Sequence, residues 1–165
     1  MLRTVKVLLV IAVGIWGVIG ALGNLGDWDG TVGAVKATTS MSTWHDGGQD
    51  WRATTNPVVV HLGSAMIPAA KLLFGALCLT GAWRMWRAKS AGGLAFERAK
   101  ALALVGCGIA LLMLFVGWIV IADTWFEVWR SDAMRDAALG SAFRYAGFVG
   151  VIALFLAARD DISDA

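Results

Sequence analysis

Residues 101–122 read ALALVGCGIALLMLFVGWIVIA and contain no charged side chain. A helix of this length, at about 1.5 Å of rise per residue, spans the roughly 30 Å of hydrocarbon in a bilayer. The stretch shows no period-two alternation of apolar and polar residues, which a barrel strand would need. Since lipid offers no hydrogen bonds to the backbone, the stretch is expected to be a transmembrane helix.

Three further apolar runs have the same character. Of the 165 residues, 58% are apolar and only 16% are charged, whereas soluble domains average about 45–50% and about 25%. The expected helices cover residues 5–23, 60–83, 101–122 and 137–158. We therefore predict an all-α membrane protein, in which residues 1–165 form a single membrane domain built as a four-transmembrane-helix bundle.

The distribution of lysine and arginine predicts the orientation, because these residues stay on the cytoplasmic side in short connections. The link 84–100 has five such cations against the single acid Glu97, whereas the segments 24–57 and 123–136 each carry more acids than cations. Both termini are therefore expected in the cytoplasm. Residues 1–23 also resemble a signal peptide, although their apolar stretch exceeds the usual length of about 7–15 residues.

Two charged residues, Lys71 and Arg144, lie deep inside the apolar runs, where an ionised group costs at least about 2.5 kcal/mol. Arg144 is expected to form a structural clamp with Asp123 or Glu127, and Lys71 to extend its long stem toward the outer face. The functional alternative is an outward-opening polar pocket of His61, Lys71, Asp123, Glu127 and Arg144. Such a pocket would bind an anionic lipid headgroup, a small anion or a partner carboxylate.

The loop 24–57 between the first two helices is long for so small a protein, and long loops tend to be functional. It contains three tryptophans, which would be a liability if they were loose in solvent. We expect a folded outer cap that covers the bundle or docks on another protein. Its candidate interaction residues are Trp28, Trp44, Trp51 and Arg52.

Small side chains inside the helices indicate where helices approach each other. Gly14, Gly17 and Gly20 recur every three residues and favour close packing of the first helix. Cys78 and Cys107 fall at similar depths on sequential antiparallel helices and are expected to be neighbours. Packing of two small apolar side chains explains them, with a redox pair as the alternative.

The sequence offers little for catalysis, metals or nucleic acid. It has no Cys-x-x-Cys pair and only two histidines, His45 and His61, so a haem held by two transmembrane histidines lacks its second ligand. We expect no metal, no cofactor and no enzymatic activity, since no nucleophile and base are placed together. A haem or quinone that is bound jointly with a partner subunit remains the alternative. A net charge of +2 without a basic block argues against nucleic-acid binding.

Short blocks along nearly the whole chain resemble the bacterial family of predicted small integral membrane proteins known as domain of unknown function 2165. The blocks are Asn24–Asp27, Met41–Thr43, Trp51–Ala53, Gly81–Trp83, Ala95–Phe96 with Lys100, Phe126, Trp129–Ser131 and Ala142–Arg144. The resemblance implies a four-helix protein of the bacterial inner membrane with a long first periplasmic loop, and no assigned activity. An acidic residue is common near Lys71 in that family, and this chain departs from the pattern there.

These observations favour a non-catalytic accessory or stabilising subunit of a larger membrane complex, such as a respiratory or photosynthetic one. The expected partners are the lipid bilayer and other membrane-protein subunits or a second copy of the chain. The alternative is a small anion- or lipid-binding transporter or channel that acts as a homo-oligomer. A subunit that passes electrons to quinone is a third hypothesis.

Overall fold

The computed structural model describes residues 1–160, and every regular element in that range is a helix. Among these residues, four helical stretches are long and apolar enough to cross a membrane: Leu2–Gly26, Pro57–Ala88, Gly93–Trp125 and Asp136–Ala157. The prediction of an all-α protein with four transmembrane helices is therefore confirmed.

The helices run further than the apolar stretches that predicted them. The first crossing is α1 (Leu2–Gly26), and the second is α3 (Pro57–Ala88). Both exceed the predicted 5–23 and 60–83, because apolar composition marks only the part in hydrocarbon, whereas the backbone stays hydrogen-bonded into the polar flanks. The remaining crossings are composite: α4 (Gly93–Ala99), α5 (Ala101–Leu112) and the π-helix η2 (Met113–Trp125) form the third, and the short π-helix η4 (Asp136–Gly140) with α6 (Ser141–Ala157) forms the fourth.

The start of α3 is fixed by local sequence. The Asn56 side chain accepts a hydrogen bond from the Val58 amide at 2.9 Å, and Pro57 occupies the first turn, where no amide hydrogen is needed. Pro68 lies inside α3 without ending the helix. The second crossing is thus one continuous helix from its N-cap, Asn56, to the link that leads into α4.

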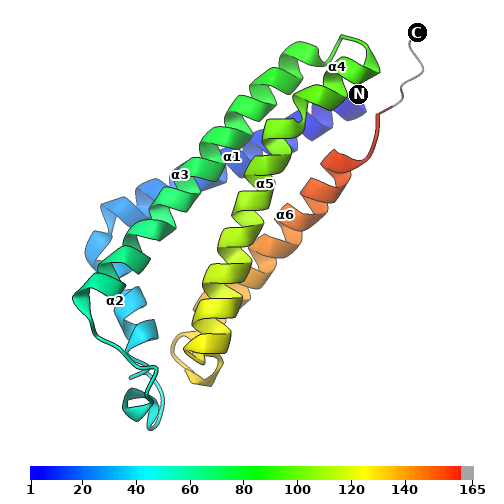
Figure 1. Cartoon of the computed structure of the whole chain (residues 1–165). Helices are drawn as coiled ribbons and strands as arrows, with labels where there is room; N and C mark the ends of the chain where they lie inside the picture. The colour runs from blue at the N-terminus through cyan, green and yellow to red at the C-terminus, as the bar shows by residue number, and fades with distance from the viewer. Residues whose placement is uncertain (161–165) are drawn as a thin grey trace.

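The four crossings form a ring in the order α1, α3, α5, α6 (Figure 1). α1 packs along most of α3, and α3 packs along α5, whereas α6 packs on α5 and meets α1 only lightly. The N-terminus and α4 lie at one end of the bundle, and the helix α2 lies at the other (Figure 1). We call these the inner end and the outer end.

Glycines allow the closest helix contacts, as the series in the first helix predicted. A Cβ atom added at Gly17 would lie 2.5 Å from a ring carbon of Phe74 and 2.8 Å from the carbonyl oxygen of Lys71. Between α3 and α5, a Cβ at Gly81 would lie 2.5 Å from the amide nitrogen of Ala103. At both places a larger residue would push two backbones apart.

The outer loop is folded, as expected, and contains a helix that the sequence did not predict. This helix, α2 (Trp28–Thr39), begins at Asp27, whose carboxylate accepts a hydrogen bond from the Gly30 amide at 3.0 Å. The side-chain amide of Asn24 donates a hydrogen bond to the hydroxyl of Thr31 at 3.0 Å, which fixes α2 against the end of α1. A 3-10 turn, η1 (Gly47–Gln49), follows, and these segments make up the outer cap.

We predict that Gly17→Ala weakens the bundle, because the new methyl group collides with the α3 backbone and not only with a movable side chain. The expected loss is about 1–3 kcal/mol, the usual cost of overpacking. Unfolding in detergent, followed by circular dichroism, measures it. Gly23→Ala is the matched control, since a Cβ there meets nothing within 4 Å. Equal stability of the two variants would contradict the proposed close contact.

Candidate functional site

The outer end is organised around the guanidinium group of Arg52. Its Nη2 lies 2.8 Å from Oδ2 of Asp50 and 2.9 Å from Oε1 of Glu127, and its Nη1 donates to the carbonyl oxygen of Trp125 at 2.9 Å. Arg130 adds a second cation, 3.0 Å from the other carboxylate oxygen of Glu127. We call these residues the outer network. It joins the cap to the segment that follows the third crossing.

Local backbone geometry positions the partners of Arg52. Asp50 lies two residues before Arg52, and its carboxylate also accepts the Arg52 backbone amide at 2.9 Å, which orients both side chains. Glu127 has a φ of 52°, a left-handed conformation that is uncommon outside glycine. This turn redirects the chain into the 3-10 turn η3 (Val128–Arg130).

The charges of the outer network stabilise one another. Hydrogen bonds from the side chain and backbone of Arg52 lower the pKa of Asp50 to about 2. Hydrogen bonds from Arg52 and Arg130 lower the pKa of Glu127, and the two carboxylates raise the pKa of Arg52. All of these groups are therefore ionised at neutral pH.

The outer network supports an exposed tryptophan. Trp51 is 81% exposed, and its ring meets that of Trp125 edge-on with 5.6 Å between centroids. The other candidates in the loop differ, because Trp28 and Trp44 are each partly buried. The indole nitrogen of Trp44 is buried and has no hydrogen-bond partner among the described residues. Of the four predicted interaction residues, only Trp51 and Arg52 therefore belong to the outer network and the aromatic contact beside it.

The predicted polar pocket is not assembled around Lys71. The ammonium group of Lys71 donates to the side-chain oxygen of Asn24 at 2.6 Å and lies 3.4 Å from the carbonyl oxygen of Gly20, both on α1. Its stem extends toward the outer end, as the snorkelling interpretation expected, but it reaches an amide of α1 and not the acids near the third crossing. Lys71 therefore links α1 to α3.

The proposed clamp of Arg144 is wrong. Its guanidinium binds the carbonyl oxygen of Gly140 and the hydroxyl of Ser141, each at 3.2 Å and both on its own helix. Within residues 1–160, no ion pair joins it to Asp123 or Glu127. Glu127 is engaged by Arg52 because its left-handed turn faces the cap.

The other two pocket candidates are also separate. The His61 ring is exposed and hydrogen-bonds the carbonyl oxygen of Pro57, one turn earlier in α3, at 2.7 Å. Asp123 lies in η2, and one of its carboxylate oxygens is buried without a partner in the described part of the chain. Neither shares a hydrogen bond with Lys71 or Arg144.

Sequence reasoning missed a buried ion cluster at the inner end. Asp160 lies 2.9 Å from the Lys6 ammonium and 2.6 Å from the Lys100 ammonium, and Glu97 lies 2.6 Å from Lys100. Both lysine side chains are only 1% exposed. The two cations and two anions balance, as a buried cluster requires. We call these four residues the inner clasp.

The inner clasp also satisfies the backbone after α6. The carbonyl oxygen of Ala158 accepts from both Lys6 and Lys100, and the Asp160 amide donates to Glu97 at 2.8 Å. Burial alone would raise the pKa of Asp160, but hydrogen bonds from the two lysines outweigh it and lower that pKa. The clasp therefore joins α1, α4 and the end of α6 through charged hydrogen bonds.

The two cysteines lie at the α3–α5 contact. Both are buried and free, and a Cβ added at Gly106 would lie 2.6 Å from Sγ of Cys78. Residues 106 and 107 therefore pack beside Cys78, which agrees with the packing role. Within residues 1–160, no three His, Cys, Asp or Glu side chains are grouped closely enough to hold a metal ion.

A ring of membrane-length helices closed by ion pairs at each end defines a small integral membrane protein. Comparison with family models gives the particular family: residues 2–159 match the predicted small integral membrane proteins of domain of unknown function 2165, and the chain belongs to this family. The resemblance noted in the sequence is thereby confirmed. Searches of curated proteins and of solved structures found no match.

We predict that Asp160→Asn destabilises the protein by about 3–5 kcal/mol, because it leaves two buried lysines with a single carboxylate. Unfolding in detergent measures the loss. Asp132→Asn is the matched control, since Asp132 is 97% exposed and pairs only at 3.6 Å with Arg135. A loss no larger than in the control would show that the inner clasp contributes little.

We predict that acid weakens the outer cap through Asp50. Its pKa in the folded protein, about 2, lies below the ordinary value of 3.8, so its contribution to stability is complete above pH 3.8 and is lost toward pH 2. The melting temperatures of the wild type and of Asp50→Asn should therefore differ at neutral pH and converge near pH 2. Asp46→Asn on the same loop is the control for loss of a loop carboxylate, and its melting temperature at neutral pH should stay close to that of the wild type, since asparagine suits the left-handed backbone at that position.

Proposed function

We propose that the protein is a non-catalytic accessory subunit that stabilises a larger complex, respiratory or photosynthetic, in the bacterial inner membrane. The observation that carries the proposal is that Trp51 is exposed while its backbone and ring are held in place by neighbouring residues. The Trp51 indole is 81% exposed and its ring contacts that of Trp125, and tryptophan is enriched among the residues that dominate binding energy at interfaces.

The support beneath Trp51 distinguishes it from a membrane anchor. An anchoring tryptophan needs only the right depth in the bilayer. Trp51 instead sits between Asp50 and Arg52, whose ion pair fixes the backbone on both sides, and its ring contacts Trp125. Little conformational entropy is left to lose when such a residue binds a partner.

The charge distribution supports termini in the cytoplasm. Lys6 and Lys100 are paired with carboxylates in the inner clasp. The excess of positive charge that indicates the orientation therefore comes from other cations, which lie on the surface of the inner end. Arg84, Arg87 and Arg98 are exposed there. By the positive-inside rule, this surface faces the cytoplasm and the outer cap faces the periplasm.

The transporter alternative has less support from the geometry. Lys71 binds α1 at Asn24, whereas Arg144 is exposed on α6 and binds its own helix. An anion route would need both cations along one path, which a single copy of the described chain does not provide. Liposome flux with Lys71→Ala and Arg144→Ala tests that alternative.

We predict that a photo-crosslinking amino acid at position 51 captures a protein partner. The full-length chain carries benzoylphenylalanine in place of Trp51 and a C-terminal tag, and native membranes are irradiated before purification in mild detergent. The expected product is one discrete adduct of higher mass, identified by mass spectrometry, together with stoichiometric co-purification of the same polypeptide.

The control places the same crosslinker at position 45, where the histidine side chain is 94% exposed and pairs only with its neighbour Asp46. It should give little or no adduct with that partner. Capture of a second copy alone, or of lipid alone, would argue against the accessory role. An absorption spectrum of the eluate then tells whether the complex carries a chromophore.

A further inference from the structure

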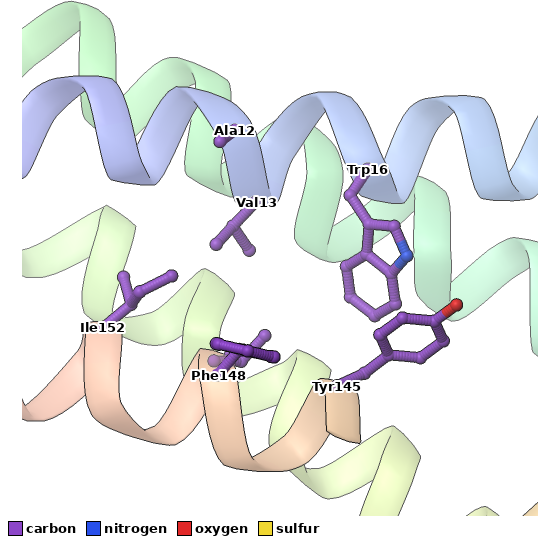
Figure 2. A pocket seen from close by; sticks show the side chains of 7 residues that line it. Ala12, Val13, Trp16, Tyr145, Phe148 and Ile152 are labelled. Carbon is purple, nitrogen blue, oxygen red and sulfur yellow. The ribbon is translucent and has the colours of Figure 1, made fainter. Parts of the chain in front are cut away.

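A groove of about 180 Å³ lies between α1 and α6, where these two helices meet only lightly. Figure 2 shows side chains from both helices directed toward each other across it. The lining residues are almost entirely apolar: Ala12, Val13, Trp16, Tyr145, Phe148, Val149 and Ile152. The groove is open on the side that faces away from the bundle, so in a membrane it faces the hydrocarbon.

Aromatic contacts hold one end of the groove in shape. The Trp16 ring lies between two others, with 5.2 Å between its centroid and that of Phe74 and 5.1 Å to that of Tyr145. Gly17, beside Trp16, seats α1 closely against α3. The groove is therefore a formed feature of the bundle, whose wall does not depend on an occupant.

The polar atoms of the lining residues gather at one end. Figure 2 shows the indole nitrogen of Trp16 and the hydroxyl of Tyr145 at the end away from Ile152. That end is the outer one, because α6 runs inward from Ser141 to Ala157. The groove is thus apolar along its length and polar at its outer end.

Arg144 lies at the same outer end. It precedes Phe148 by four residues, so the two side chains lie on one face of α6, with the arginine nearer the outer surface. Its guanidinium reaches back one turn to the Gly140 carbonyl oxygen and keeps further donors free. Among residues 1–160, no carboxylate pairs with it.

We propose that this groove binds an anionic phospholipid of the outer leaflet, with one acyl chain along Phe148 and Ile152 and the headgroup phosphate on Arg144. A cation at membrane depth is kept for a partner, and guanidinium groups bind phosphate through paired hydrogen bonds. The volume suits a segment of an acyl chain and not its whole length, since an engineered cavity of about 150 Å³ holds one benzene molecule, which has six carbons. A partner helix, about 10 Å across, occupies far more than 180 Å³ over even two turns, so it cannot fill the groove. The proposal is independent of the accessory role.

The test is native mass spectrometry of the full-length protein in detergent, titrated separately with dioleoylphosphatidylglycerol and dioleoylphosphatidylcholine. The wild type should bind the anionic lipid about fivefold more tightly, the ratio that corresponds to about 1 kcal/mol for one arginine near anionic lipid. Arg144→Gln should weaken the binding of both lipids, because each carries a phosphate that loses its hydrogen bonds, and should remove the preference, because the cation that favours a net negative lipid is gone. Ala12→Phe should fill the groove and weaken both lipids.

Matched controls separate the site from general effects of charge and bulk. Arg135→Gln removes another outer arginine, and Ala76→Phe adds a ring on the exposed lipid face of α3; neither should change either affinity. Equal affinity of the wild type for both lipids would overturn the proposal, as would a preference that survives Arg144→Gln. A dimer that is lost in Ala12→Phe while lipid binding stays unchanged would assign the groove to a second copy instead.

Discussion

The pairing of Asp160 with Lys6 and Lys100 is the interaction on which the arrangement of the fourth crossing depends. α6 meets α1 only lightly, and apolar burial gives no driving force between helices that are already in lipid. The inner clasp supplies what packing does not, because a buried lysine without its carboxylate is far costlier than one with it. Lys6 has its carboxylate only when the end of α6 lies against α1, whereas Lys100 also pairs with Glu97 on α4.

The two ends of the bundle are closed by ion pairs of different kinds. In the inner clasp, Lys6, Lys100 and Asp160 are nearly inaccessible to water, so the charges of these three side chains interact at low dielectric. The outer network is partly exposed, and it fixes a surface loop that holds an aromatic pair. Between them the helices approach through glycine contacts, as at Gly17. The bundle therefore has a largely buried ionic contact at its inner end and a partly exposed one at its outer end.

Apolar composition was sufficient to predict the four crossings, because lipid permits few alternatives for a long uncharged run. It was insufficient for α2, which is short and carries no long apolar run, and for the π-helical part of the third crossing. Arg52 was found as a loop residue, but its partner Glu127 depends on a backbone turn that the sequence does not reveal. The pairing of Lys6 could not be predicted, since its partner Asp160 is 154 residues away in the sequence. Arg144 was assigned a partner on the third crossing, although its donors are used along its own helix.

That separation of 154 residues has a consequence for how the protein is made. At about 5–20 residues per second, a ribosome needs about 8–30 s to proceed from Lys6 to Asp160. Throughout that interval Lys6 has no carboxylate from the tail, so its ammonium group needs water or another partner. Lys6 becomes an internal counter-ion only once the last residues of the chain have been made. The inner end can close only after the last crossing has entered the membrane.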